Sequence, residues 1–215
     1  MSECLRARIE RVWRQEGLLG VGRKCLAVLA ESLCGYTRHV RMRRPLDAPL
    51  PEIIPGVTLS IGWLEPEELA EYLDSRGVAE TDVLYGADAV RDLLNLKDRC
   101  LIARHDGRIA AATWVSFASV RSEGILPIDD GEVYLFGDYT AVPLRGQGIM
   151  PALRVELLRR LREEGHRSAM LLTRPDNTAA IRANAKTGFH IDALIHAIKW
   201  GSWHRLWIVP VARRT

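Results

Sequence analysis

The most informative part of this sequence is Val142-Pro-Leu-Arg-Gly-Gln-Gly-Ile-Met-Pro-Ala-Leu153, where a predicted strand runs into a basic turn and then into a predicted helix. The first N–H groups of a helix have no partner within the helix, and the helix dipole favours negative charge beside them. Gly146 and Gly148 let the backbone approach an anion closely, and Arg145 adds a positive charge. The turn therefore predicts a phosphate site, although strand-glycine-helix junctions also occur for packing reasons alone.

Outward from this turn, predicted strands and helices alternate from Gly56 onward. Asp106-Gly107 favours a tight type I′ hairpin, so the strands beside it should be antiparallel. Apolar residues one turn apart, beginning at Ile149, predict an amphipathic helix after the turn. Strands are expected at 57–64, 100–105, 108–117, 132–142, 168–173, 191–200 and 203–211, and helices at 65–75, 83–96, 149–164 and 177–186.

The positive charge is concentrated at the start of the chain. The formal net charge is only +3, too balanced to indicate a nucleic-acid binder. The first 50 residues, however, hold ten basic and five acidic residues. We predict a basic amphipathic helical extension at 1–44, a proline-rich linker at 45–55 and a larger domain of alternating strands and helices at 56–215. The extension either packs on the domain or on a second subunit of a homodimer, or it contacts an anionic membrane or an acidic partner.

Composition narrows the class of protein. With 215 residues, 47% hydrophobic and 27% charged, the chain suits one large globular domain. The four cysteines, at 4, 25, 34 and 100, have neither metal-ligand nor disulfide-framework spacing, and His190 and His196 lack a third ligand, so we expect no metal. An acidic residue at position 3 argues against a secretory signal, and no apolar run is long enough to span a bilayer. A cytoplasmic location is expected.

At the turn the sequence resembles the GNAT acetyltransferase superfamily. The loop of that family has Gln or Arg, two residues, Gly, one residue, then Gly or Ala. Arg145-Gly-Gln-Gly148-Ile-Met150 matches the first two fixed positions and has Met150 at the third. A second similarity is a strand, Asn177, a short helix and Lys-Thr-Gly188-Phe189. The resemblance covers about residues 56–200 and implies a GNAT-type α/β (α+β) fold, with a mixed, mostly antiparallel sheet flanked by helices.

The resemblance also implies a ligand, acetyl-CoA or another acyl-CoA. Its pyrophosphate would lie on the amides that begin the helix, its pantetheine arm would run beside the preceding strand, and a strand amide would polarise the thioester carbonyl. Asn177 resembles the residue that binds the pantetheine or adenine end, although helix capping is its simpler role. The residues so implied are Thr140, Ala141, Val142, Arg145, Gly146, Gln147, Gly148, Ile149, Met150 and Asn177.

Acyl transfer to an amine needs a base for the ammonium proton and an acid for the departing thiolate. Strand alternation would put Glu132, Tyr134, Phe136 and Asp138 on one face, so either carboxylate is a candidate base, directly or through water. A solvated strand end for Glu132 and a structural role for Asp138 are the alternatives. Many family members use a Tyr as the acid. Asn184 stands at that position. Its amide can donate a hydrogen bond to the sulfur but cannot deliver a proton, so either water or another group, Tyr139 or Tyr134, must serve, or catalysis is lost.

The sequence thus predicts an N-acyltransferase that moves acetyl from acetyl-CoA to a primary amine of a small molecule. A non-catalytic acyl-CoA-binding regulatory module of the same fold is one alternative, suggested by Asn184 and Met150. A membrane-associated acyltransferase acting on a lipid-linked or sugar substrate is another, suggested by the basic extension.

Overall fold

The computed structural model describes residues 35–77, 87–120, 126–200 and 203–211. The chain divides into two compact units. The larger is His39–Leu194 with Pro210–Thr215, and the smaller comprises the chain up to Arg38 together with Ile195–Val209. The amphipathic helices expected before residue 35 lie outside the described residues.

Strands and helices alternate along the chain as the sequence predicts. The strands are β1 (Thr37–Pro45), β2 (Ser60–Trp63), β3 (Arg99–His105), β4 (Arg108–Ser116), β5 (Ser119–Val120), β6 (Leu126–Pro127), β7 (Glu132–Thr140), β8 (Ser168–Thr173), β9 (His190–Trp200) and β10 (Trp203–Pro210). The helices are α2 (Leu69–Arg76), α3 (Ala87–Asn95), α4 (Ile149–Glu163) and α5 (Thr178–Lys186), with 3₁₀ helices η1 (Pro66–Glu68) and η2 (Val142–Leu144).

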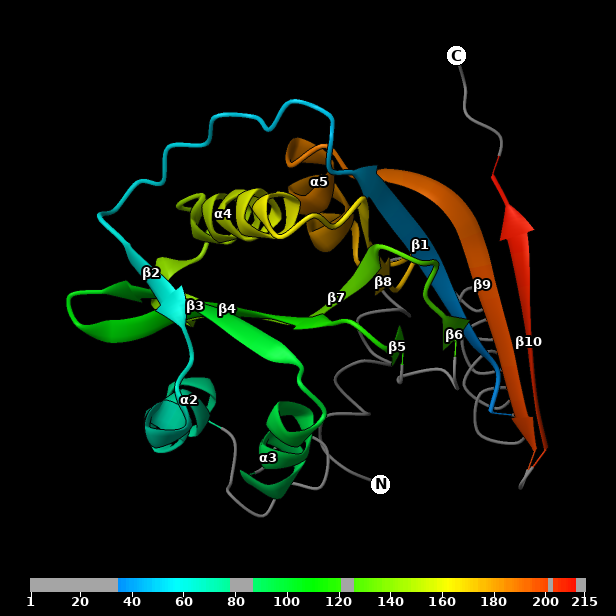
Figure 1. Ribbon diagram of the computed structural model, residues 1–215, viewed down its shortest axis with the longest axis horizontal. Helices are drawn as coiled ribbons and strands as arrows, with labels where there is room; N and C mark the ends of the chain where they lie inside the picture. Colours follow the sequence, from blue (N-terminus) through cyan, green and yellow to red (C-terminus); the bar gives the residue numbers. More distant parts are fainter. Residues whose placement is uncertain (1–34, 78–86, 121–125, 201–202, 212–215) are drawn as a thin grey trace, which may run out of the picture. The chain divides into compact units, whose positions relative to one another are not determined.

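The larger unit contains a mixed sheet with the strand order β9-β1-β8-β7-β4-β3-β2 (Figure 1). The pairs β1–β8, β2–β3, β3–β4 and β4–β7 are antiparallel, whereas β7 and β8 are parallel. A parallel pair needs a long crossover, which α4 provides. Strands β5 and β6 form a separate two-stranded ladder. The predicted α/β fold with a mostly antiparallel sheet is therefore confirmed.

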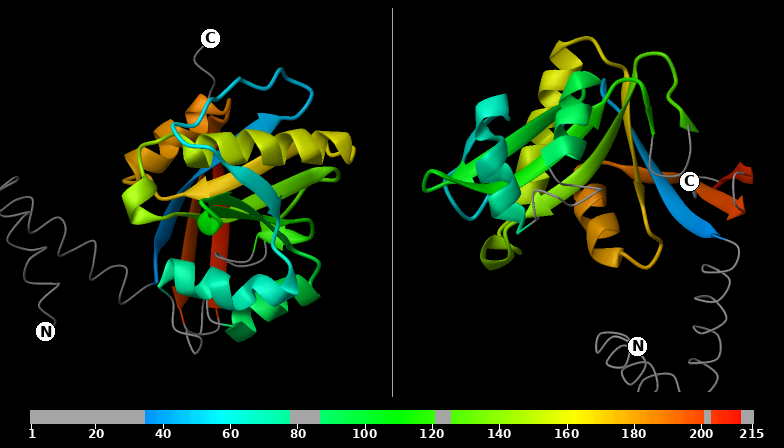
Figure 2. Two further views of the ribbon diagram at one scale, coloured as in Figure 1. Left: turned by 90° about the vertical axis from the view of Figure 1, so that its left-hand side faces the viewer. Right: turned by 90° about the horizontal axis from the view of Figure 1, so that it is seen from below.

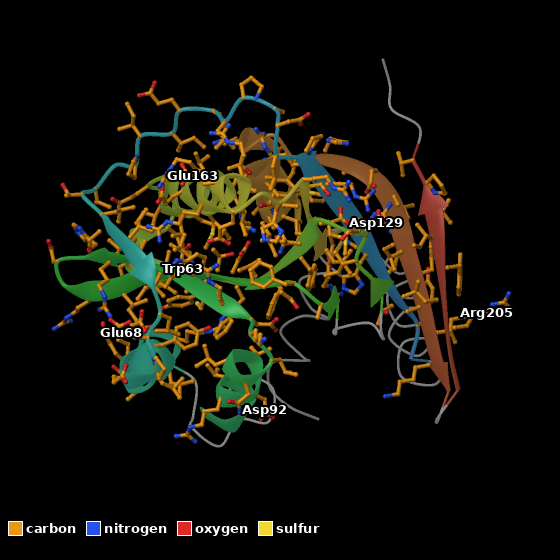
Figure 3. All side chains as sticks on the ribbon, in the orientation of Figure 1. Trp63, Glu68, Asp92, Asp129, Glu163 and Arg205 are labelled. Atoms are coloured by element: carbon orange, nitrogen blue, oxygen red, sulfur yellow. The ribbon has the colours of Figure 1, made fainter. Side chains whose placement is uncertain are left out.

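Helices cover both faces of this sheet: α4 lies on one face, and α2 and α3 lie on the other (Figure 2). Alternation along β3 divides the core between them. Leu101 and Ala103 pack in the cluster that contains α4, whereas Cys100 and Ile102 pack with α2 and α3. Side chains fill the layer between α4 and the sheet, with Trp63 at its β2 edge (Figure 3).

Several local predictions are confirmed, and others are displaced by a few residues. The hairpin residues Asp106 and Gly107 both have positive φ, 49° and 75°, as a type I′ turn requires. The apolar stripe of α4 is buried as predicted. In contrast, the strand expected from residue 57 begins at Ser60, the helix expected from residue 65 begins as η1, and β7 ends at Thr140 rather than at residue 142.

The basic segment before the prolines is a strand, so its assignment to a helical extension was wrong for residues 37–44. Burial alternates along β1, where Val40, Met42 and Arg44 are buried and the residues between them are less so. The strand pairs with β8 from Val40↔Thr173 to Pro45↔Ser168. Closely spaced arginines are compatible with one face of a strand as well as with one face of a helix. The basic composition of this segment therefore did not distinguish a strand from a helix.

The proline-rich segment that follows β1 lies along α4 (Figure 1). It has no regular structure between residues 50 and 55, as its prolines require. Its end is attached to the turn before α4, because Gly56 N donates to Gln147 O at 2.8 Å. The segment borders a groove of about 750 Å³ whose other wall is Ala152, Val155 and Glu156 of α4. The predicted linker therefore packs on the domain.

Arg44 connects this segment to the end of α5. Its side chain is buried and donates to the carbonyl oxygens of Thr187 at 2.6 Å and Pro49 at 2.7 Å. Gly188 follows the C-cap of α5 and has φ +86°, and a Cβ there would lie 1.5 Å from Arg44 Nη1. The glycine of the Gly188-Phe189 pair is therefore required by its backbone conformation and by the arginine that crosses it.

The smaller unit contains the second half of β9 and β10, which pair as neighbouring strands. Tyr36 Oη lies 2.7 Å from His196 Nδ1, and the His196 ring stacks on Trp207 with centroids 5.2 Å apart. Trp207 is 37% exposed.

Because the Arg44 side chain crosses Gly188, replacing Gly188 by Ala should destabilise the protein more than the same change at Gly165. Both glycines follow the C-cap of a helix and have positive φ, +86° and +89°, but a Cβ at Gly165 would meet no atom of the described residues within 4 Å. We expect losses of about 1 kcal/mol for Gly165→Ala and about 3 kcal/mol or more for Gly188→Ala. Urea unfolding at pH 7 measures both. Equal losses would contradict the role given to Arg44.

Candidate functional site

The parallel strands β7 and β8 separate before β7 ends. Their pairing runs from Glu132↔Ser168 to Leu135↔Leu171. β7 then continues from Phe136 to Thr140 with no β8 partner among the residues that the structure describes. Backbone groups on that edge are free to pair with something else, because a strand edge is a row of donors and acceptors. The separation opens the centre of the sheet beside the turn that precedes α4.

β7 contains a bulge in its unpaired part. On the β4 side, Trp114 pairs with Phe136 and Ala112 with Tyr139, so Thr113 alone faces the two residues Gly137 and Asp138. Gly137 has φ +66°, and a Cβ on it would lie 2.8 Å from Trp114 Cδ1. A residue with a side chain would need an unfavourable backbone conformation and the displacement of a buried indole.

The bulge changes which face each side chain occupies. Phe136 and Tyr139, three residues apart, both pack with the α2 and α3 cluster. Asp138 is turned toward α4: it accepts a hydrogen bond from Thr113 Oγ1 at 2.8 Å and forms an ion pair with Arg154 of α4. The prediction that Asp138 shares a face with Phe136 was therefore wrong, since regular alternation does not hold across a bulge.

Glu132 lies at the opposite end of β7. Its side chain is 1% exposed, and Arg43 contacts both of its oxygens, at 2.6 Å from Nε and 2.8 Å from Nη2. Ser168 Oγ donates to Glu132 Oε1 at 3.1 Å, and Asp129, labelled in Figure 3, also contacts Arg43. At about 3.3 Å per residue, the strand separates Glu132 from Thr140 by roughly 25 Å. The structure thus does not bring Glu132 together with Asp138 and Tyr139.

The turn before α4 has the geometry expected of an anion site. Gly146 and Gly148 have φ of +83° and +74°, and Gly148 is the N-cap of α4. The first described bond of the helix runs from Ala152 N to Gly148 O. Among the described residues, no backbone hydrogen bond uses an N–H between residues 146 and 150. These donors, at the positive end of a 15-residue helix, can bind phosphate oxygens.

Arg145 and Gln147 have partners within the protein. Arg145 Nε donates to Thr140 O at 3.2 Å, so the guanidinium joins the end of β7 to the turn while remaining exposed. Gln147 O accepts from Gly56, as described above. The amide of Ala141 donates to Ala110 O at 2.8 Å. A ligand beside the open edge of β7 can therefore accept hydrogen bonds from the N–H groups of the turn, but not from that of Ala141.

Tyr139 belongs to a cluster on the α2 side of the bulge. Its hydroxyl donates to Ser75 O, and the Arg76 guanidinium lies 5.7 Å from its ring centroid. Arg76 also donates to the hydroxyl of Tyr72, which accepts from Trp114 Nε1 at 2.8 Å. Burial raises the pKa of Tyr72, so this phenol stays neutral at ordinary pH. The cluster joins the end of α2 to the indole that contacts the bulge.

The family of the chain follows from its sequence. The profile of the Acetyltransferase (GNAT) family matches residues 64–189, which is more than half of the 215 residues. The chain belongs to the GNAT acetyltransferase family. The match contains the bulge, the turn, α4 and α5.

Solved structures share the GNAT fold. A GNAT-family protein from Novosphingobium aromaticivorans is 18% identical with a TM-score of 0.55, over 82% of this chain and 66% of its own. A GCN5-related N-acetyltransferase from Sphaerobacter thermophilus is 16% identical with a TM-score of 0.54, over 86% and 56%. An N-acetyltransferase from Staphylococcus aureus Mu50 is 17% identical with a TM-score of 0.51, over 72% of this chain and 98% of its own. This chain thus spans less than two thirds of the first two proteins. No curated protein matched the sequence.

The remaining GNAT motif residues have clear structural positions. Asn177 caps α5, since its Oδ1 accepts from Ala180 N at 3.2 Å. Asn184 is buried on α5, and its carbonyl accepts from Thr187 N and Phe189 N. Ile149 is fully buried in the core under α4, and Met150 packs partly against it. The residue that departs from the family loop is thus accommodated by packing.

Sequence reasoning missed Arg154, Thr113, Tyr72 and Arg76. The signal for Arg154 was present, because it lies in the apolar stripe of α4 beside Leu153, where a surface arginine does not belong. Tyr72 and Arg76 are four residues apart on α2, a spacing that places them on one face. Thr113 had no such signal, since its role depends on the bulge.

Among the described residues, no group of three or more His, Cys, Asp or Glu side chains is placed to hold a metal ion. None of the described helices combines the length and the apolar character needed to cross a bilayer.

Tyr72→Phe should lower the free energy of unfolding by about 1–3 kcal/mol, because it leaves the buried Trp114 Nε1 and the Arg76 guanidinium without their shared acceptor. Chemical denaturation at pH 7 measures the loss. A midpoint equal to that of the wild type would show that the cluster contributes no stability.

The same phenol should give a pH signature. Because the pKa of Tyr72 is raised in the folded protein, the hydroxyl ionises first in the unfolded chain, and stability falls as the pH rises above about 10. Unfolding free energies measured from pH 8 to pH 11 should therefore decline more steeply in the wild type than in Tyr72→Phe. Parallel declines would contradict this assignment.

Proposed function

We propose that the protein is an acetyl-CoA-dependent N-acetyltransferase that transfers acetyl to a primary amine of a small molecule by direct attack. The observation that carries this proposal is the separation of β7 from β8 directly beside a glycine turn whose N–H groups donate no backbone hydrogen bond within the described part of the chain. One ligand with a flexible arm and a pyrophosphate suits both features. A cytoplasmic location and a homodimer remain part of the proposal.

The ligand would bind through two sets of backbone groups. Its pyrophosphate accepts from the N–H groups between Gly146 and Met150, supported by the dipole of α4. Its arm pairs with the edge of β7 that β8 leaves open, as a peptide adds a strand to a sheet. Asn177 would contact the outer part of the ligand beside its capping bond. Thr140 and Val142 would flank the ligand where it passes from the edge of β7 to the turn, and Arg145 would lie next to it.

The reaction follows from where the thioester would lie. The amine nitrogen attacks the carbonyl carbon, a C–N bond forms, and the C–S bond breaks as the thiolate leaves. An N–H group of the bulge residues Gly137 and Asp138 would be the donor for the charge that develops on the carbonyl oxygen, and such donors contribute about 10²–10³ in rate. The amine proton passes to solvent. The thiolate receives a proton from solvent or from the hydroxyl of Tyr134 or Tyr139, and Tyr139 would first have to release its hydrogen bond to Ser75 O.

Asn184 would act only as a hydrogen-bond donor near the sulfur, since an amide has no proton to give at ordinary pH. Asp138 is removed from the role of base by its contacts, because one oxygen accepts from Thr113 and the other from Arg154. Glu132 is also unsuited to act as the base, because it lies at the start of β7, far along the strand from the bulge where the thioester would lie.

A second candidate function, acyl-CoA binding without catalysis, is favoured by the lack of an identified acid and base. With Asn184 at the family's tyrosine position and with neither carboxylate placed as a base, a non-catalytic acyl-CoA-binding module would have the same structure. The membrane-associated alternative depends on residues 1–34, which lie outside the described residues, while Arg41 and Arg43 of the basic segment pair with Asp192 and Glu132.

Two measurements separate these functions. Calorimetry with acetyl-CoA should show saturable binding below about 1 mM. Thiol release from acetyl-CoA should then rise above hydrolysis with at least one amine in a panel of amino sugars, amino acids and polyamines. Binding without release for every amine favours the module. No binding at 1 mM excludes both. Equal activity with and without anionic vesicles argues against the membrane enzyme.

Removing one N–H group from the turn should weaken acetyl-CoA binding specifically. Met150→Pro deletes a donor in the first turn of α4, where proline is tolerated, and Met150→Ala is the matched control that loses the side chain but keeps the N–H. We expect an affinity about tenfold lower for Met150→Pro than for Met150→Ala, because a hydrogen bond to a charged oxygen is lost. Calorimetry measures the ratio, and a ratio near one would contradict the site.

A further inference from the structure

We propose that Arg154 is a positioning residue for acetyl transfer: through Asp138 it holds the bulge of β7 in the conformation that presents a backbone N–H to the thioester carbonyl. This inference rests on the proposed function, because it concerns the same strand edge. It assigns a role to an arginine that neither GNAT sequence motif contains.

Arg154 occupies a position that normally holds an apolar side chain. It lies in the buried stripe of α4, between Leu153 and Leu157, and its side chain is 1% exposed. A buried guanidinium is costly unless it is paired and hydrogen-bonded. Asp138 is the carboxylate that pairs with it, whereas Arg154 Nε and Nη1 have no hydrogen-bond partner among the described residues. Compensation of this charge therefore depends on Asp138.

Asp138 is one of the two residues that face Thr113 across the bulge. Its Oδ1 accepts from Thr113 Oγ1 at 2.8 Å, and its Oδ2 accepts from Arg154. On the opposite face of the sheet, Gly137 lies against the indole of Trp114. The bulge is thus held on both faces, by an ion pair from α4 on one and by aromatic packing on the other.

This arrangement matters for transfer more than for binding. An oxyanion donor is effective only when it is held within about 0.5 Å of its productive position. The Asp138 side chain is 36% exposed, so without Arg154 it can turn to solvent and release the bulge. The turn from Gly146 to Met150 does not involve this ion pair, so pyrophosphate binding should continue. Loss of Arg154 should therefore reduce thioester polarisation while leaving affinity almost unchanged.

The test uses Arg154→Lys and, as matched control, Arg159→Lys on the same helix. Arg159 is 44% exposed and pairs with Glu156 and Glu163, so the control changes an ion-paired arginine at the surface. The probe is acetyl-CoA labelled with ¹³C at the acetyl carbonyl. Calorimetry gives its affinity, and the ¹³C chemical shift in the complex reports hydrogen bonding to the carbonyl oxygen. Turnover with the amine accepted by the wild type gives kcat.

We expect Arg154→Lys to bind acetyl-CoA within about threefold of the wild type. Its carbonyl signal should move back toward the position of free acetyl-CoA, and kcat should fall by about 10–100-fold. Arg159→Lys should match the wild type in all three. A merely structural role would lower the melting temperature and leave the carbonyl shift of the folded complex unchanged.

A second variant covers the case in which Arg154→Lys does not fold. Thr113→Val removes the hydroxyl bond to Asp138 without leaving a buried charge unpaired, and should shift the carbonyl signal in the same direction by a smaller amount. Unchanged signals in both variants, or in the one that folds, overturn the inference. A wild-type complex whose carbonyl signal equals that of free acetyl-CoA also overturns it. Absence of binding by the wild type overturns the proposed function itself, and the inference with it.

Discussion

The extra residue in β7 opposite Thr113 is the constraint on which the site depends. β7 pairs with β4 on both sides of this point, so the strand cannot leave the sheet, and the additional residue must be accommodated locally. Gly137 accommodates it with φ +66°, against the indole of Trp114. As a result Tyr139 faces α2 and Asp138 faces α4. Without the bulge these two side chains would exchange faces, and both clusters around the strand would be lost.

α4 couples the core to the site. The same helix that buries Leu153, Leu157 and Leu161 also carries the glycine turn at its N-terminus and Arg154 in its second turn. The segment after β1 packs along this helix and is attached to the turn through Gly56. A displacement of α4 would therefore move the N–H groups of the turn and the support of Asp138 together. The one charged residue in the apolar stripe of α4, Arg154, is the one that contacts the bulge through Asp138.

The parts of the fold that depend on local sequence could be predicted. The hairpin at Asp106-Gly107, the apolar stripe of α4 and the glycine turn each follow from residue type and spacing. β1 could not be predicted, because Arg41, Arg43 and Arg44 suit a helix face equally well and only pairing with β8 decides between them. Its register with a strand more than a hundred residues away is not a local property.

The candidate site likewise has one part that local sequence predicts and another that depends on tertiary contacts. The turn was predictable because its glycines and Arg145 are adjacent in sequence. The roles of Glu132 and Asp138 were not, because period-two alternation assumes a regular strand and the bulge breaks it. Glu132 has the residue type of a base, but Arg43 and Ser168 use its oxygens. Which carboxylates are engaged is decided by tertiary contacts that spacing does not reveal.

In the function that we propose, acetyl-CoA lies along the open edge of β7 with its pyrophosphate on the turn before α4. A crystal structure of the acetyl-CoA complex tests it most directly. Phosphate oxygens should lie about 2.7–3.2 Å from N–H groups between Gly146 and Met150, and the thioester oxygen should face an N–H of Gly137 or Asp138. A ligand bound elsewhere, or β7 paired with β8 beyond Leu135 in the complex, would contradict it.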